Sequence, residues 1–301
     1  MRLVPISPSS SPRRFLRVPR LAVLVTSLAL GLACGHSYED QAGKCSGETE
    51  LAAPMAFARP EAMGTFQCPS GMAFVPGSSG DEKGSEDIDG MHQPVGSTCV
   101  DESEVTLAAY TACVTANVCT AAGQADFCNW GRPDRLDHPI NCVDWCQATA
   151  YCVYAGKRLP TAAEWVQAGR GQKPRIYPWG YRLPDNEALC WRRYDFDRRE
   201  GLGTCPVTEP LLDKTPEGIG GMAGNVREWT SSRWNSITES RWKSVRGGAW
   251  ETDPRYGSIR PDVNLRFDAA TRVADLGFRC VIDAPSKVIL VAPTASPGEA
   301  Q

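Results

Sequence analysis

A helical period of apolar positions marks the centre of the chain. Asp144 is a favourable N-cap residue, and Gln147 follows three residues later, as in a capping box. The apolar stripe of this predicted helix consists of Trp145, Ala148, Cys152 and Ala155. Gly156 is placed to end the helix. Since Cys152 lies on the apolar face, the pattern favours a structural disulfide over a reactive thiol.

Local signals predict two more helices and two strands. Thr106 can cap a helix that carries Leu107, Tyr110, Cys113 and Val114. A second capping box, from Thr161 to Glu164, begins a helix that ends at 169–171. Residues 72–77 read as a short strand with a turn, and residues 99–101 begin another strand. Beyond residue 171, short apolar pieces, glycine pairs and tryptophans predict irregular structure to the end.

The N-terminal segment has the features of an export signal. Residues 1–20 contain five arginines and no acid, and residues 21–33 form an apolar run too short to span a bilayer alone. The run ends at Ala33-Cys34-Gly35, which resembles a bacterial lipoprotein signal. We therefore expect a signal peptide at 1–33, lipidation of Cys34 and export to the cell envelope. A glycine after the cysteine, here Gly35, resembles lipoproteins that are sent to the outer membrane. Simple secretion is the alternative to lipidation.

The cysteine content supports an oxidising compartment. The chain has 13 cysteines among 301 residues, so twelve remain besides Cys34, and an even number allows all of them to pair. Loss of residues 1–33 removes five arginines and lowers the formal net charge from −3 to −8. This balance provides no basic field for nucleic acid. We interpret residues 34–66 as a polar tether and residues 284–301 as a disordered tail.

Acidic residues are concentrated between residues 78 and 97. Their spacing does not match an EF-hand, so a solvated loop is favoured over a calcium-binding loop. The acidic positions are Asp81, Glu82, Glu86, Asp87 and Asp89.

Eight short motifs in a fixed order resemble one protein family. They are Met-Ala-Phe-Val-Pro-Gly at 72–77, Cys-Val-Asp…Glu-Val-Thr at 99–106, His-Pro-Ile-Asn-Cys-Val-Asp-Trp at 138–145, Ala-Gly-Lys-Arg-Leu-Pro-Thr at 155–161, Tyr-Pro-Trp-Gly at 177–180, Met-Ala-Gly-Asn-Val-Arg-Glu-Trp-Thr at 222–230, Arg-Gly-Gly at 246–248 and Leu-Gly-Phe-Arg-Cys at 276–280. Over residues 67–283 the chain resembles the formylglycine-generating enzyme, or sulfatase-modifying factor, family. The resemblance implies a C-type-lectin-like α+β fold, rich in loops and held by aromatic packing and disulfides.

The resemblance also implies one disulfide, between Cys152 and Cys280, which would join the central helix to the last strand. Two short loops make further pairs plausible, although the sequence does not fix the connectivity. These pairs are Cys190–Cys205 and Cys128–Cys142.

The best-known activity of this family is the oxidation of a sulfatase cysteine to formylglycine, with oxygen and a copper(I) ion held by two cysteines after Arg-Gly-Gly. Thr252 and Gly257 occupy the two cysteine positions here, and no cysteine lies between residues 205 and 280. Thiolates are the ligands that select Cu(I). Ala249 replaces the family's active-site serine, and Arg227 replaces its tryptophan. We therefore expect no copper and assign no catalytic residue.

Other metals have weaker support. The histidines, His36, His92 and His138, do not form the pattern of iron-dependent relatives. The family places calcium at positions that match Gly224, Val226 and Glu228, while Gly221 replaces a side-chain ligand. An alternative role for Glu228 is that of a carboxylate satisfied by backbone N–H groups.

These observations favour a non-catalytic envelope lipoprotein that acts as a binding or accessory module for a peptide, a glycan or an envelope protein. One alternative is an enzyme on the same scaffold, such as a formylglycine-generating-type oxidoreductase. Another is a purely structural envelope protein. Several tryptophans could line a groove, although a core position is favoured for each. They are Trp179, Trp191, Trp234, Trp242 and Trp250.

Overall fold

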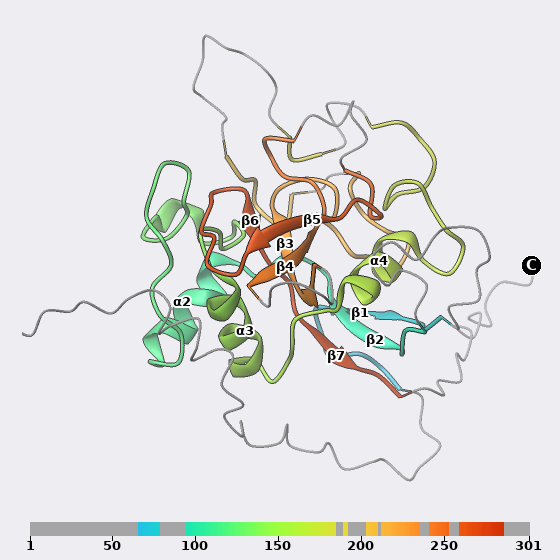
Figure 1. Cartoon of the computed structure of the whole chain (residues 1–301), viewed down its shortest axis with the longest axis horizontal. Helices are drawn as coiled ribbons and strands as arrows, with labels where there is room; N and C mark the ends of the chain where they lie inside the picture. The colour runs from blue at the N-terminus through green and yellow to red at the C-terminus, as the bar shows by residue number, and fades with distance from the viewer. Residues whose placement is uncertain are drawn as a thin grey trace, which may run out of the picture. The chain divides into compact units, whose positions relative to one another are not determined.

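Two small sheets and the helices around them organise the part of the chain that can be described (Figure 1). The computed structural model describes residues 66–78, 94–184, 189–191, 203–209, 212–234, 241–252 and 259–285. The predicted signal peptide, Cys34, most of the tether, the acidic positions 81–89, Gly257 and most of the C-terminal tail lie outside these residues. No helix in these ranges is long and apolar enough to cross a bilayer.

The three-stranded sheet joins the two ends of the described chain. Its strands are β1 (Met72–Val75), β2 (Thr98–Asp101) and β7 (Val281–Asp283), in the order β1-β2-β7 and antiparallel throughout. The disulfide Cys68–Cys99 ties the segment before β1 to β2. Both strands predicted from the sequence at 72–77 and 99–101 are present in this sheet.

The four-stranded sheet lies in the segment that we predicted to be irregular, so that prediction was wrong. Its order is β5-β4-β3-β6, and only the β3–β6 pair is parallel. The strands are β3 (Arg227–Arg233), β4 (Trp242–Arg246), β5 (Leu265–Asp268) and β6 (Leu276–Gly277). The apolar alternation that marks a strand is missing because charged residues such as Glu228 and Arg246 occupy buried positions in β3 and β4.

The helices begin at the predicted caps. They are α2 (Leu107–Thr115), the 3-10 helix η1 (Pro133–Arg135), α3 (Trp145–Tyr154) and α4 (Ala162–Arg170). Thr106 accepts from the Ala109 backbone N–H. Asp144 and Thr161 each form a reciprocal capping box, with Gln147 and Glu164. These side chains satisfy N–H groups that a helix end leaves without intrahelical partners.

The core lies between α2, α3 and the four-stranded sheet. Tyr110 stacks on Tyr151, and Phe278 meets both rings edge-on. Trp229 of β3 is fully buried and donates from its indole N–H to the Val143 carbonyl. Aromatic packing therefore holds a fold that has little regular structure, as the resemblance implied.

Five disulfides connect the described residues. The structure joins Cys152 of α3 to Cys280, which directly precedes β7. It also joins the short-loop pairs suggested by the sequence and two others. These four are Cys128–Cys142, Cys190–Cys205, Cys113–Cys119 and Cys68–Cys99.

Candidate functional site

Two glycines at the end of β4 position the segment that the sequence singled out. Gly247 has a φ of +84°, a conformation that L side chains rarely adopt. A Cβ atom at Gly248 would lie 2.2 Å from the Ala223 carbonyl oxygen. Larger residues would therefore push this chain away from the loop at 222–225. The Trp250 backbone N–H donates to the Asn225 carbonyl, which fixes residues 249–252 against that loop.

Thr252, which the resemblance matches to the first copper cysteine of the family, holds a turn. Its Oγ1 accepts from the Ala249 N–H at 2.9 Å, and its own N–H donates to the Ala249 carbonyl at 2.8 Å. The Thr252 side chain is buried, as is the methyl group of Ala249. The two replaced positions thus bond to one another through backbone and hydroxyl groups. Gly257, at the second copper-cysteine position, lies outside the described residues.

Arg227 connects this turn to the last loop of the domain. Its Nη2 donates to Thr252 Oγ1 at 3.1 Å, and its Nη1 lies 3.5 Å from Glu251 Oε1. The guanidinium also forms an ion pair with Asp275, whose carbonyl accepts from the Arg227 backbone N–H. Burial lowers the pKa of Arg227, and the charge of Glu251 acts in the opposite direction. Three of the four replaced positions, at Arg227, Ala249 and Thr252, therefore form one hydrogen-bonded group.

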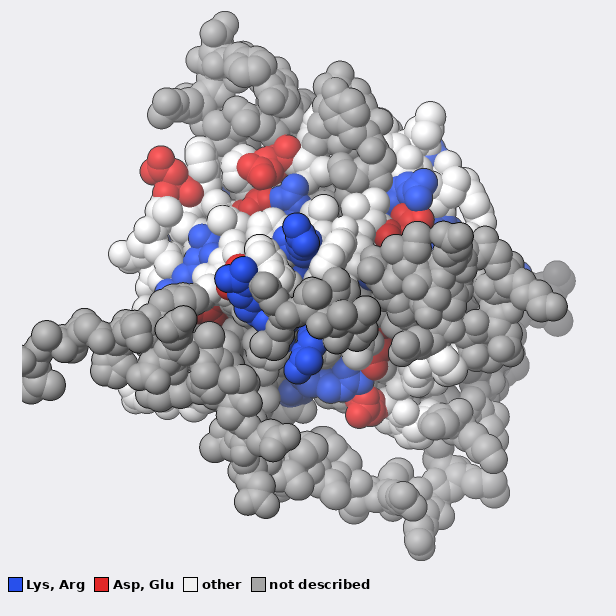
Figure 2. Space-filling view, in the orientation of Figure 1, with Lys and Arg blue, Asp and Glu red and all other residues white. Residues whose placement is uncertain are grey.

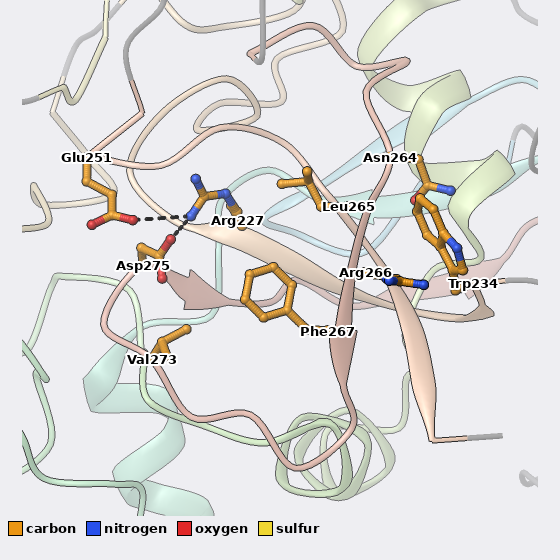
Figure 3. A pocket seen from close by; sticks show the side chains of 9 residues that line it. All are labelled: Arg227, Trp234, Glu251, Asn264, Leu265, Arg266, Phe267, Val273 and Asp275. Atoms are coloured by element: carbon orange, nitrogen blue, oxygen red, sulfur yellow. Dashed lines mark ion pairs between the residues drawn. The ribbon is translucent and has the colours of Figure 1, made fainter. Parts of the chain in front are cut away.

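A cavity of about 600 Å³ adjoins this group (Figure 3). Arg227, Glu251 and Asp275 lie at one end, as the close view shows. The remaining lining residues are Trp234, Asn264, Leu265, Arg266, Phe267 and Val273. The volume suits a few peptide side chains or a small ligand. Among the described residues, no group of three His, Cys, Asp or Glu side chains could hold a metal ion.

Glu228, the predicted calcium ligand, is fully buried and bound to Arg279. Its Oε1 accepts from Arg279 Nη2, and its Oε2 accepts from Arg279 Nε and Trp165 Nε1, each at 2.7 Å. The donors to the Glu228 carboxylate are therefore side chains, and not the backbone N–H groups of the alternative prediction. A calcium ion here would have to share Glu228 with a guanidinium. The residues fit such an ion poorly, and calcium at Gly224, Val226 and Glu228 stays a prediction.

Sequence reasoning missed two buried carboxyl groups beside Glu228. Burial raises the pKa of Glu104 to about 8 and that of Asp213 to about 6. Asp213 Oδ2 accepts from the N–H groups of Ala223 and Gly224. A Cβ at Gly221 would lie 2.5 Å from both Glu104 oxygens, so glycine there makes room for that carboxyl. Nothing in the sequence around Asp213 marks it as buried.

The histidines and tryptophans singled out from the sequence contact neighbouring parts of the fold, where the structure describes them. His138 Nδ1 lies 2.9 Å from Thr204 Oγ1, and burial lowers the pKa of this imidazole. Trp250 is buried, whereas Trp179, Trp191, Trp234 and Trp242 are partly exposed. His36 and His92 lie outside the described residues.

Comparisons with known proteins agree with this geometry. The family model described as "Sulfatase-modifying factor enzyme 1-like domain" matches residues 65–284. The formylglycine-generating enzyme of Mus musculus is 32% identical over 182 residues, 52% of this chain and 49% of that protein. The "Inactive C-alpha-formylglycine-generating enzyme 2" of Bos taurus is 33% identical over 157 residues, 50% of this chain and 52% of that protein. The chain thus spans about half the length of these curated relatives.

A solved structure shows the same fold. The crystal structure of CarF superimposes with a TM-score of 0.55 at 18% identity, over 74% of this chain and 100% of that one. At this identity the likeness concerns the fold alone.

Proposed function

Because the chain belongs to the family of sulfatase-modifying factor enzyme 1-like domains and has its α+β fold, we propose that it is a non-catalytic binding or accessory module. In this proposal the domain is carried by an exported envelope lipoprotein anchored through Cys34. The cavity beside Arg227 serves as the binding site, and no cysteine is oxidised there. The anchor rests on the N-terminal sequence, and the lack of catalysis rests on the site described above.

The observation that supports this proposal best is the bonding of Thr252. A copper(I) ion is selected by soft thiolate sulfur, and Thr252 offers a hard, neutral hydroxyl at the matching position. That hydroxyl is engaged by the Ala249 N–H and by Arg227. The guanidinium also places a positive charge beside the position where a cation would bind, which disfavours the cation.

A relative gives the proposal a precedent. The bovine protein that shares 33% identity over 157 residues is named as inactive. The family thus includes a member named for lacking the activity, while the mouse relative is named for having it. The fold alone therefore does not establish the activity of a family member.

A copper(I) titration tests the proposal. The full chain, purified with its disulfides intact, is titrated against a chromophoric Cu(I) chelator, with a formylglycine-generating enzyme as the positive control. We expect the chelator to keep its copper, because no thiolate pair is available at positions 252 and 257. Transfer of one copper ion per chain, abolished by Thr252→Val, would contradict the proposal.

A further inference from the structure

Strand β5 forms one edge of the four-stranded sheet, and no described strand pairs with its outer side. One hydrogen bond, from the Ala269 N–H to the Arg241 carbonyl, shows which residues of β5 face β4 with their backbone N–H and C=O groups. Since hydrogen-bonded positions alternate along an antiparallel pair, Leu265 and Phe267 also bond to β4. The N–H and C=O of Arg266 therefore point away from the sheet. Among the described residues, neither group has a partner.

The cavity beside Arg227 runs along this open edge. Asn264, Leu265, Arg266 and Phe267 are consecutive, and all four line it. Side chains of successive strand residues point to opposite faces of a sheet. A single cavity that contacts residues of both faces must pass the outer edge of β5, and it continues to Arg227 of β3 and to Trp234, which directly follows β3. Figure 3 agrees, because Leu265 and Phe267 project to one side of the strand and Arg266 to the other.

The two sides of this edge differ in chemistry. Leu265, Phe267 and Val273 form an apolar wall on one side. On the other side, the guanidinium of Arg266 lies 5.2 Å from the centre of the Trp242 ring, as does that of Arg241. Stacking orders a guanidinium while its N–H edge stays able to bind a carboxylate. Arg266 is exposed, and among the described residues Asp268 of the same strand forms its ion pair with Arg241 and not with Arg266.

Positive charge extends beyond Arg266 on this part of the surface. Arg233, at the end of β3, is also exposed. Figure 2 shows several Lys and Arg side chains over the region where Figure 1 places β3, β4 and β5, with Asp and Glu side chains next to them. This local charge contrasts with the net negative charge of the chain, −3 for the full sequence. Glu251 and Asp275, at the other end of the cavity, are paired with Arg227, and Asp268 of β5 is paired with Arg241. The end of the cavity at Arg266 is therefore the part that is complementary to an acidic ligand.

We propose that the open edge of β5 binds an extended acidic peptide as an additional strand. This inference rests on the proposed function, because it names the partner of the same cavity. The peptide backbone would pair with the outward N–H and C=O of Arg266. Its side chains would alternate between apolar groups facing Leu265 and Phe267 and carboxylates facing Arg266. Pairing at a sheet edge is a common mode of peptide recognition, in which alternate side chains confer specificity.

Fluorescence anisotropy with labelled peptides tests the inference on the full chain. The probe is a short peptide that alternates valine and glutamate, compared with one that alternates valine and lysine. We expect the glutamate peptide to bind at least about tenfold tighter. N-methylation of the peptide amide groups that face β5 should weaken binding by about tenfold, because it removes backbone donors without changing the protein. Equal binding of the methylated peptide would overturn the inference.

Two variants of Arg266 distinguish the contribution of its backbone N–H to peptide binding from that of its side chain. Arg266→Ala removes the charge and keeps the outward N–H. Arg266→Pro removes both, without disrupting a bond to β4, because the N–H of this residue points outward. We expect the proline variant to bind the glutamate peptide about tenfold more weakly than the alanine variant. Equal binding by two variants with similar melting temperatures would overturn the inference.

The outcome is independent of the copper titration. Binding of a sulfated polysaccharide, with no binding of the glutamate peptide, would refute the peptide inference and leave the non-catalytic proposal standing. Copper transfer with tight peptide binding would refute the non-catalytic proposal and leave the strand pairing standing.

Discussion

At the scale of single residues, the site consists of residues that differ from the family pattern and that form hydrogen bonds and ion pairs with one another and with their neighbours. The sequence alone identifies Thr252, Ala249 and Arg227 as departures from the family pattern. It does not show that these residues bond together, because the contacts join positions 227, 249–252 and 275 through the fold. Asp275 and Glu251, which balance the arginine, have no sequence signal of their own.

Removal of Arg227 should destabilise the domain. Arg227→Ala leaves the buried carboxylate of Asp275 without its cation, which should lower the free energy of unfolding by about 3 kcal/mol. Chemical denaturation measures the change. Arg132→Ala is the matched control, because its ion pair with Asp134 is solvent-exposed and screened by water, so the loss of this pair should change stability little. Equal losses in the two variants would show that the network at Arg227 has no structural role.

Glu104 should make stability depend on pH. Burial raises its pKa from the ordinary glutamate value of 4.5 to about 8 in the folded protein, so the folded state retains a proton that the unfolded chain releases. The contribution of Glu104 to the free energy of unfolding should therefore be largest below pH 4.5 and be lost as pH rises toward 8, by about 1 kcal/mol per pH unit. Asp213, with a pKa raised to about 6, acts in the same direction.

Glu104→Gln isolates this contribution, because the amide keeps the shape of the protonated acid and does not titrate. Urea denaturation between pH 5 and pH 8 should show a flatter profile for this variant than for the native chain. An identical slope in the two proteins would mean that Glu104 is ionised in the folded state. Asp134→Asn is the control, since Asp134 is exposed.

At the scale of elements, the sequence predicts helices better than strands. The starts of α2, α3 and α4 follow from local chemistry, since each cap side chain bonds an N–H three residues ahead. The strands β3 and β4 were missed because their buried positions include Glu228, Arg246 and Ser244. Buried charge is stable there only because partners distant in sequence supply the opposite charge, as Arg279 does for Glu228.

The cap of α3 should contribute more than the cap of α2. Asp144 accepts from the Gln147 N–H and also forms an ion pair with Arg272, whereas Thr106 only caps its helix. Asp144→Ala should lower the free energy of unfolding by about 2 kcal/mol, and Thr106→Ala by about 1 kcal/mol. Thermal denaturation compares the two variants. A larger loss for Thr106→Ala would argue against a role for the Arg272 contact.

At the scale of the whole molecule, cross-links between distant segments define the domain. The resemblance implied the pair Cys152–Cys280, and the structure contains it, whereas composition and spacing alone left the connectivity open. The edge of β5 and its cavity could not be predicted from the sequence. They depend on the order β5-β4-β3-β6, which follows from packing rather than from any local pattern.

The disulfide between Cys152 and Cys280 should stabilise the domain more than the short ones. It closes a sequence separation of 128 residues, against 6 for Cys113–Cys119. By the loop-entropy relation, replacing both cysteines of the long pair by alanine should cost about 5 kcal/mol, and replacing the short pair about 2 kcal/mol. Guanidinium denaturation measures both losses. Similar losses would indicate that strain or residual structure outweighs the entropy of the unfolded chain.

The most direct test of the non-catalytic account is a turnover measurement. The purified chain is incubated with copper(I), oxygen and a cysteine-containing sulfatase peptide, and the peptide is examined by mass spectrometry, with an active formylglycine-generating enzyme alongside. The account predicts an unchanged cysteine, because Thr252 is held by Ala249 and Arg227. Conversion of the cysteine to formylglycine over many turnovers would contradict it.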